Sequence, residues 1–293
     1  MGNMVLSILI TLVLIVPGQV LADRAIPDSC LAYPAHISLN NSSMASGFFL
    51  NDGTNVYLVT AKHALFNIAS GKLSATQATI TAYSSNPHEE AKNILSLDLS
   101  ILSEAKNIRR HPTADVATVC IAKVLQTDEY FNLKTLPGIT YTEKASTGIF
   151  GTNIDTVKFF KNVLIANTIY MFGYPTSIGI KRSPQFDLLR PLLRSGIVAG
   201  INPKLKTIIL DCPSYPGNSG GPVLEMERIS LKRQQFRIIG VVSQFIPFAE
   251  TWVNKTHGYT NTNFSNSGYC VAVSMDPVIE LIKYSQQTAD DHE

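Results

Sequence analysis

The chain has 293 residues, of which 45% are hydrophobic and 16% are charged, and its formal net charge is +2. This composition supports a well-developed core, and the charge balance does not favour a nucleic acid partner or a polybasic membrane contact. The His, Cys and Asp residues show no spacing typical of metal ligands, so we expect neither a metal nor another cofactor.

The first 22 residues are predicted to be a signal peptide. Residues 4–16 form an uncharged apolar run that is too short to span a bilayer, and the small residue Ala22 precedes a plausible cleavage position. A retained anchor is the alternative, because no Lys or Arg precedes the apolar run. We therefore expect a secreted or periplasmic protein with no stable membrane insertion after signal removal.

Residues 23–293 are predicted to be all-β, because short β-rich runs alternate with Gly, Asn, Asp and Pro. In the first half, residues 47–50 and 56–59 flank an Asp-Gly turn and predict a hairpin. His63 follows the second of these strands and begins a short helical turn. Further strands are expected at 78–83 and 116–121. The turn-rich segment 124–155 is the expected link to the second half.

The second half shows the same pattern and ends in a helix. Its predicted strands are 163–172, 193–199, 207–210, 236–243 and 268–273. Asp276-Pro277 is typical of a helix start and predicts a helix at about 276–287. Two runs of short strands indicate two packed six-stranded antiparallel β-barrels, at about 30–135 and about 155–275, followed by this helix.

Four cysteines follow the predicted signal: Cys30, Cys120, Cys212 and Cys270. In an exported chain an even number permits two disulfides, with three possible pairings. Buried thiols are the alternative, because reduced Cys packs like a small hydrophobic residue. We expect at least one disulfide and take Cys30 with Cys270 as the candidate pair.

The segment Gly217–Pro222 is the strongest functional signal, because its glycines surround a single serine, Ser219. Such a turn folds tightly and leaves backbone N–H groups to face a substrate. A serine hydroxyl needs a base, and the base needs a group that orients it. His63 and Asp115, which lie upstream in Thr-Ala-Lys-His and Thr-Ala-Asp contexts, are the candidates.

The order His63, Asp115, Ser219 resembles that of the trypsin/chymotrypsin-fold serine peptidases, nearest to the bacterial HtrA-like and glutamyl-endopeptidase-like branch. The resemblance covers nearly all of residues 44–284 in family order. The matching segments are 46–49, 59–63, 114–117, 173–175, 195–198, 211–222, 240–243 and 268–273. It implies a chymotrypsin-like pair of barrels and hydrolysis of protein or peptide substrates through an acyl-enzyme.

The resemblance also implies a role for each matching residue. Ser219 attacks the carbonyl carbon, His63 takes and returns the proton, and Asp115 orients the imidazole. The N–H groups of Gly217 and Ser219 form the oxyanion hole. Ser243 is placed to hydrogen-bond Asp115.

Two departures from animal trypsin-like enzymes shape the expected activity. Asn218 replaces the aspartate that pairs with a new amino terminus, so zymogen-type activation is not expected. The substrate-binding residues are expected to be Pro213, Ser243, Gln244 and Phe245. Because Pro213 stands where an acid would bind a substrate Lys or Arg, these residues predict an apolar primary pocket. The segment after residue 281 is too short for a PDZ domain, so simple proteolysis by a monomer is expected.

Alternative readings exist for the same residues. Ser219 could be an ordinary turn serine and Asp115 a simple cap. His111 is a rival base, but it precedes Pro112 in a charged loop and is expected to face water, as is Lys62. The main functional alternative is an inactive homologue that acts as a binding module. An esterase or a narrow self-processing peptidase is a third reading.

Overall fold

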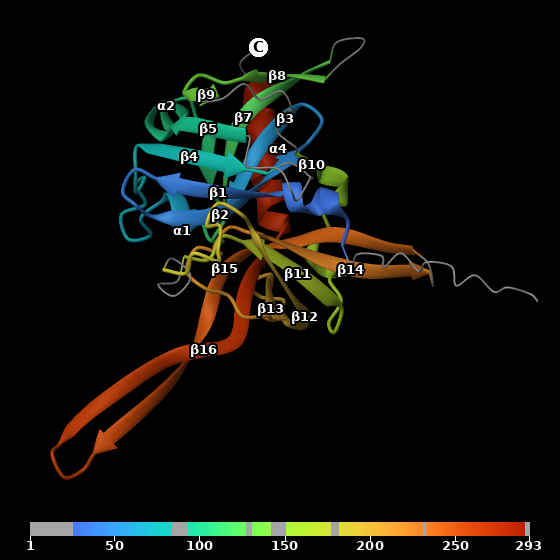
Figure 1. Ribbon diagram of the computed structural model, residues 1–293. Helices are drawn as coiled ribbons and strands as arrows, with labels where there is room; N and C mark the ends of the chain where they lie inside the picture. The colour runs from blue at the N-terminus through green and yellow to red at the C-terminus, as the bar shows by residue number, and fades with distance from the viewer. Residues whose placement is uncertain are drawn as a thin grey trace, which may run out of the picture.

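The computed structural model describes residues 26–83, 93–126, 131–141, 151–176, 182–230 and 233–290. Two β-sheets lie one above the other, and the C-terminal helix α4 (Asp276–Asp290) runs behind the upper one in this view (Figure 1). The predicted signal residues 1–22 lie outside the described part of the chain. Among the described residues, the helices are too short or too polar to cross a bilayer.

The first sheet contains ten strands, with short helices between some of them. Its main path runs β6-β7-β3-β2-β1-β4-β5-β9, while β8 pairs with β7 and β10 pairs in parallel with β2. The elements are η1 (Asp28–Ala32), β1 (Pro34–Leu39), β2 (Met44–Asn51), β3 (Asn55–Thr60), α1 (Lys62–Leu65), β4 (Gln77–Ala82), β5 (Asn93–Asp98), α2 (Leu99–Glu104), β6 (Ile108–Arg110), β7 (Ala117–Gln126), β8 (Phe131–Thr135), β9 (Ile139–Tyr141) and β10 (Thr152–Asn153).

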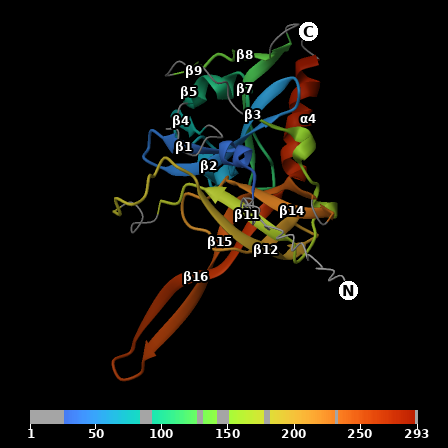
Figure 2. The same cartoon turned by 45° about the vertical axis from the view of Figure 1, so that its right-hand side comes forward.

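The second sheet is a closed barrel of six strands in the order β11-β12-β13-β16-β15-β14. Its elements are η2 (Ile154–Thr156), η3 (Phe160–Asn162), β11 (Thr168–Gly173), β12 (Leu192–Asn202), β13 (Thr207–Asp211), β14 (Pro222–Ser230), β15 (Arg233–Asn254) and β16 (Tyr259–Ser274). The turned view in Figure 2 shows this barrel below the first sheet, with α4 alongside.

The two sheets share a core because β2 and β3 are buried on both faces. Leu58 of β3 points into the core of the first sheet, whereas its neighbours Tyr57 and Val59 point into a second core. That second core also contains Phe172 of β11 and Ile279 of α4. Because successive strand residues face opposite sides, the continuous apolar run of β3 joins the two halves of the molecule.

The predicted all-β class with a terminal helix is confirmed, and the second barrel has the predicted six strands. The first sheet differs, because it contains ten strands and extends past the predicted 30–135 to Asn153. Strands β8, β9 and β10 therefore occupy the segment 124–155, which was expected to be a link. Helix α4 begins at Asp276, as predicted, and the Asp276 carboxylate also accepts the Phe160 N–H at 2.8 Å.

The disulfide prediction is wrong for the described residues: all four cysteines are thiols. Cys30 packs in the core shared by the two halves, whereas Cys212 and Cys270 pack in the core of the second barrel. Cys30 and Cys270 thus belong to separate clusters. Burial raises the pKa of Cys120 and of Cys270 to about 12, so these groups act as small apolar side chains rather than as thiolates.

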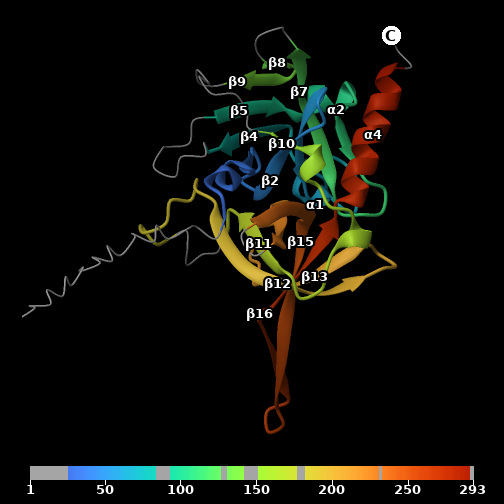
Figure 3. The same cartoon turned by 90° about the vertical axis from the view of Figure 1, so that its right-hand side faces the viewer.

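One feature lies outside both sheets. Beyond the barrel, β15 and β16 continue as a two-stranded ribbon of residues 246–266, which we call the arm. Figures 1, 2 and 3 all show it extending away from the body of the molecule. No such hairpin was predicted for this segment.

Candidate active site

Ser219 lies in the turn between β13 and β14, and the turn is possible only because three positions around it are glycines. Gly217 and Gly220 have φ values of 94° and 90°, which L residues with a side chain rarely adopt. A Cβ on Gly220 would lie 2.0 Å from the Ser46 carbonyl oxygen, and one on Gly221 would lie 2.1 Å from the Phe172 carbonyl oxygen. The glycines therefore let the turn press against both sheets.

Ser46 of β2 anchors this turn from the first sheet. Its N–H donates to the Ser219 carbonyl at 2.8 Å, and its hydroxyl donates to the Gly217 carbonyl at 2.7 Å. The same hydroxyl accepts the Tyr174 N–H at 2.9 Å, and the Ser46 carbonyl accepts the Thr60 hydroxyl at 2.7 Å. Because Ser46 is fully buried, these four hydrogen bonds fix the turn without competition from water.

His63 lies in α1, directly after β3, and Asp115 lies in the loop before β7, so both are at the same end of the first sheet. The Nδ1 atom of His63 lies 2.7 Å from Oδ2 of Asp115, and the His63 backbone N–H donates to Oδ1 at 3.0 Å. The Ser243 hydroxyl donates to Oδ2 at 2.6 Å. With an ionised carboxylate as its partner, Nδ1 carries the proton, so Nε2 is left as an acceptor.

The Asp115 carboxyl is stabilised as an anion. Burial raises its pKa, but the hydrogen bond and charge of His63, the Ser243 hydroxyl and the His63 backbone N–H together outweigh burial. The pKa of Asp115 is therefore below its usual value. Asp115 is negative throughout the neutral pH range, where it can hold the imidazole in one orientation.

His111 and Lys62, which were expected to face water, instead support the Asp115 loop. The His111 side chain is largely buried, and its Nδ1 accepts the Ala114 N–H at 2.9 Å. Its Nε2 lies 3.2 Å from the Glu280 carboxylate of α4, and Lys62 donates to the His111 carbonyl at 3.0 Å. His111 is thus a structural residue here, with both ring nitrogens occupied.

Ser219, His63 and Asp115 line one cleft of about 750 Å³ between the two halves of the molecule. The Ser219 hydroxyl donates to the Ser243 carbonyl at 3.5 Å, which is a long contact. Among the described residues, no hydrogen bond joins the Ser219 hydroxyl to the His63 ring, although both groups face the cleft. The backbone N–H groups of Gly217 and Ser219 also donate to no acceptor among the residues that the structure describes.

The predicted substrate-binding residues are partly brought together. Ser243, Gln244 and Phe245 of β15 line the cleft. Pro213 is not among its lining residues; Ser214 and Tyr215, the next two positions, take that place.

Two contacts hold this wall of the cleft. The Arg194 guanidinium lies 4.6 Å from the centre of the Tyr215 ring, and the Asn266 amide donates to the Ser214 carbonyl at 2.6 Å. The apolar rim of the cleft also includes Met44 and Ile68, which the sequence did not single out.

The comparisons with known proteins agree with this architecture. The family model of the trypsin-like peptidase domain matches residues 45–228. A solved structure of the thermostable serine protease AL20 from an extremophilic microorganism has a TM-score of 0.52 and 14% identity, covering 90% of this chain and all of that one. At this identity the likeness shows the fold alone. A search of curated proteins gave no match.

Two other similar structures have lower scores. Deg5 has a TM-score of 0.48 and 13% identity, covering 86% of this chain and 88% of that one. A Glu endopeptidase in complex with MPD has a TM-score of 0.46 and 16% identity, with coverages of 90% and 95%. Because the family model spans more than half of the sequence, the chain belongs to the family of trypsin-like peptidase domains and is a serine-type peptidase.

Proposed function

We propose that this protein is an exported serine endopeptidase that cleaves peptide bonds through an acyl-enzyme, with His63, Asp115 and Ser219 as its catalytic triad. The observation that carries the proposal is the 2.7 Å contact between His63 Nδ1 and Asp115 Oδ2, in a cleft that Ser219 also lines. This contact leaves His63 Nε2 as the one basic nitrogen available to a nucleophile.

In the proposed reaction, the Ser219 oxygen bonds to the substrate carbonyl carbon while its proton passes to His63 Nε2. The carbon–nitrogen bond then breaks, and Nε2 returns the proton to the leaving amine. His63 then takes a proton from water, whose oxygen bonds to the acyl carbon; the bond to the Ser219 oxygen breaks, and Nε2 returns the proton to that oxygen. Asp115 holds the ring and stabilises the imidazolium. Catalytic hydrogen bonds are often long before substrate binds, so the missing contact between Ser219 and His63 is compatible with these roles.

The N–H groups of Gly217 and Ser219 are the proposed oxyanion hole. Since neither donates to an acceptor within the described protein, both are available to the oxyanion of a tetrahedral intermediate. The Ser46 hydroxyl donates to the Gly217 carbonyl and so sets the orientation of the Gly217–Asn218 peptide, which lies between the two proposed donors. One donor of this kind contributes about 3–4 kcal/mol to transition-state stabilisation.

The proposed primary specificity is for apolar side chains. Phe245 and Tyr215 line the cleft near Ser219, and the segment before Ser219 carries Pro213 where an acid would select Lys or Arg. Among the side chains that line the cleft, the only acid is Asp115, which is engaged by His63 and Ser243. Export is proposed separately, on the uncharged apolar run at residues 4–16.

A fluorophosphonate probe tests the catalytic proposal, because it labels only an activated serine. The protein should be labelled and should cleave casein, and Ser219→Ala should abolish both. Ser43→Ala is the matched control, since this exposed serine lines the same cleft and should keep the labelling. Absence of labelling in the folded wild-type protein would instead support the inactive binding homologue. Activity on ester substrates without cleavage of peptides would support the esterase reading.

A further inference from the structure

The arm is built from the same strand that forms one wall of the active-site cleft. β15 pairs with β14 only as far as Val241 and with β16 from Gly240 to Asn254. Within the described part of the chain, the edge of β15 from residue 243 onward therefore has no neighbouring strand on one side. This open edge begins at Ser243 and Phe245 in the cleft and continues within the same strand into the arm, past an irregularity in the β16 pairing between Phe245 and Pro247.

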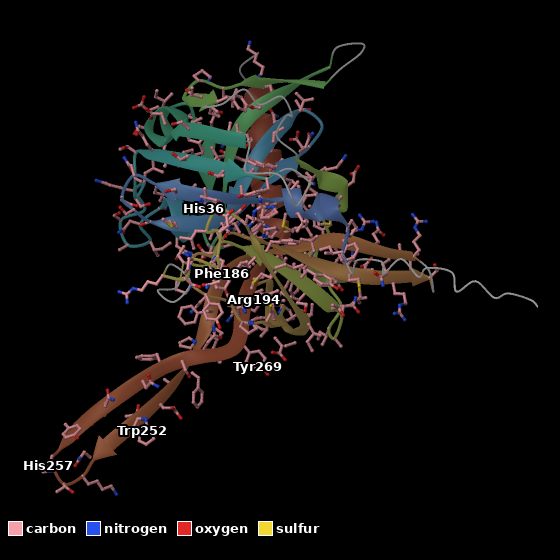
Figure 4. All side chains as sticks on the ribbon, in the orientation of Figure 1. His36, Phe186, Arg194, Trp252, His257 and Tyr269 are labelled. Atoms are coloured by element: carbon pink, nitrogen blue, oxygen red, sulfur yellow. The ribbon has the colours of Figure 1, made fainter. Side chains whose placement is uncertain are left out.

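The arm exposes large apolar side chains along its whole length. Five of them are between 52% and 67% exposed: Phe248, Trp252, Val253, Tyr259 and Phe264. Figure 4 shows Trp252 and His257 far out along the arm, well away from either sheet. A two-stranded ribbon has no core of its own and is at best marginally stable in water, so such a surface indicates a binding site.

The register places these side chains on both faces of the arm. Phe248 and Trp252 alternate on one face of β15, beside the open edge. Phe264 lies on the opposite face, where it pairs with Ala249, and belongs to β16. A ligand that lies flat on one face would leave the other face uncovered. A chain that adds as a third strand contacts both faces, because its alternate side chains point to opposite sides.

Charge and position narrow the choice of ligand. Glu250 and Lys255 are the only carboxylate and ammonium side chains in the arm, so attraction to a charged partner is weak. The tip, residues 255–258, is Lys-Thr-His-Gly, and entering a lipid bilayer tip first would desolvate the Lys255 ammonium. The apolar side chains lie instead between the tip and the cleft, along the path that a substrate chain would follow.

We infer that the arm is an exosite for extended polypeptide substrates, which add as a third strand to the open edge of β15 and place apolar side chains against Phe248 and Trp252. The inference rests on the proposed peptidase function and assigns it a substrate class: long, unfolded chains with apolar residues at alternate positions. The arm holds the part of the chain that extends beyond the cleft, so it strengthens binding without taking part in the chemistry.

The first experiment compares long and short substrates. One peptide has about 20 residues, long enough to follow the arm at 3.3 Å per residue, and carries alternating Leu and Lys around a cleaved bond. The second keeps only about six residues around the same bond and fills the cleft alone. Replacing residues 248–265 by Asn-Gly, which joins the directly paired Pro247 and Asn266, removes the arm. We expect kcat/KM for the long peptide to fall about tenfold or more through KM, with the short peptide unchanged.

Point variants show which edge of the arm, that of β15 or that of β16, binds the substrate chain. Phe248→Ser/Trp252→Ser removes two aromatic side chains from β15, and Tyr259→Ser/Phe264→Ser removes two from β16 as a matched control. The first pair should raise KM for the long peptide about fivefold or more, and the second less than about twofold. Equal effects of the two pairs, or equal losses on both peptides, would overturn the inference.

Binding to an inactive protein separates this inference from the proposed function. With Ser219→Ala, fluorescence anisotropy of the labelled long peptide should show binding that the arm deletion weakens about tenfold, even if the wild-type protein proves inactive. Two other results would contradict the inference. In one, the deletion leaves peptide binding unchanged but converts a dimer to a monomer in light scattering. In the other, it leaves peptide binding unchanged but abolishes sedimentation with phosphatidylcholine vesicles.

Discussion

The two halves of the molecule contribute to the site in different ways. The first sheet holds His63 and Asp115 by contacts within that sheet, a backbone hydrogen bond and a side-chain hydrogen bond. The second barrel carries the Ser219 turn, which is fixed from both sides: Val242 of β15 exchanges backbone hydrogen bonds with Gly220 and Gly221, and Ser46 of the first sheet holds Ser219 and Gly217 across the boundary. The proposed His63–Asp115 pair is therefore held mainly within the first sheet, with Ser243 as its one hydrogen-bond partner from the second barrel. The position of Ser219, the proposed nucleophile, depends on how the two halves pack.

This difference predicts where a substitution acts. A change in the His63–Asp115 pair should remove chemistry and leave the fold intact. A change in the polar core of the second barrel should destabilise the fold. A change at the boundary should lower both the activity and the stability, each to a smaller degree. The four predictions below test this division.

The largest effect is expected for Asp115→Asn. The Asn amide can donate to His63 Nδ1, which favours the tautomer with its proton on Nε2, and that nitrogen can no longer accept a proton from Ser219. We expect kcat for a peptide substrate to fall about 10⁴-fold, with KM and the thermal unfolding midpoint nearly unchanged. Stopped assays at high enzyme concentration and calorimetry measure the two quantities. A loss of activity that merely follows a loss of folded protein would contradict the division.

The second prediction concerns the buried ion pair of the second barrel. Lys158 Nζ lies 2.8 Å from Oε2 of the fully buried Glu225 and also contacts Glu227. Lys158→Met leaves the Glu225 carboxylate unpaired in the core, which should lower the free energy of unfolding by about 3–5 kcal/mol. Urea denaturation followed by circular dichroism measures this loss.

The matched control for this pair is Lys158→Met/Glu225→Gln. The glutamine has no charge to desolvate, and its amide oxygen can still accept from Asn167 and from the Leu164 N–H, as Glu225 Oε1 does. The double variant should therefore recover most of the lost stability. If it is as unstable as Lys158→Met, the cost comes from lost packing rather than from the buried charge.

The third prediction tests the boundary. Ser46→Ala leaves the Tyr174 N–H and the Gly217 carbonyl without their hydroxyl partner in a fully buried position. The free energy of unfolding should fall by about 1–3 kcal/mol, and kcat should fall together with it because the turn loosens. The exposed Ser103→Ala is the control and should change neither quantity. A stability loss with an unchanged kcat would show that the turn keeps its shape without Ser46.

The local geometry of the candidate site is visible in the sequence, and the structure shows why. A Cβ on Gly220 or Gly221 would overlap a carbonyl oxygen of the other strands, so small residues around Ser219 are a physical requirement that the sequence displays directly. The start of α4 at Asp276 is equally local, because an Asp-Pro pair favours a helix start whatever surrounds it.

The sequence is less informative where partners are distant. Ser46 lies in an apolar strand and acts on Gly217, which is 171 residues away, so no local pattern marks its role. Four cysteines indicated a disulfide, but their separation into different cores is a tertiary property. The arm was not predicted, for two reasons. Its apolar side chains do not pack into a core, and its turn, closed by the hydrogen bond from the Gly258 N–H to the Asn254 carbonyl, lacks a common hairpin dipeptide.

The smallest predicted effect concerns Ser243, through which the second barrel acts on a carboxylate of the first sheet. Its hydroxyl is one of the groups that lower the pKa of Asp115, and Ser243→Ala removes that contribution. A carboxyl whose pKa is lowered by folding stabilises the protein above its unfolded pKa of about 3.9, and this stabilisation is lost as pH falls through the folded pKa. Ser243→Ala should therefore be less stable than wild type by about 1–2 kcal/mol at neutral pH. The difference should disappear in acid, once Asp115 is protonated in both proteins.

Urea titrations from neutral pH down to pH values below the Asp115 pKa measure this difference, and carboxyl-carbon NMR measures that pKa directly. Ser243→Thr is the control, because it keeps the hydroxyl and should restore both the pKa and the stability. A difference in stability between Ser243→Ala and wild type that is the same at every pH would mean that Ser243 stabilises the cleft by packing. In that case Asp115 would depend on the first sheet alone, and the two halves would be coupled at this site only through Ser46.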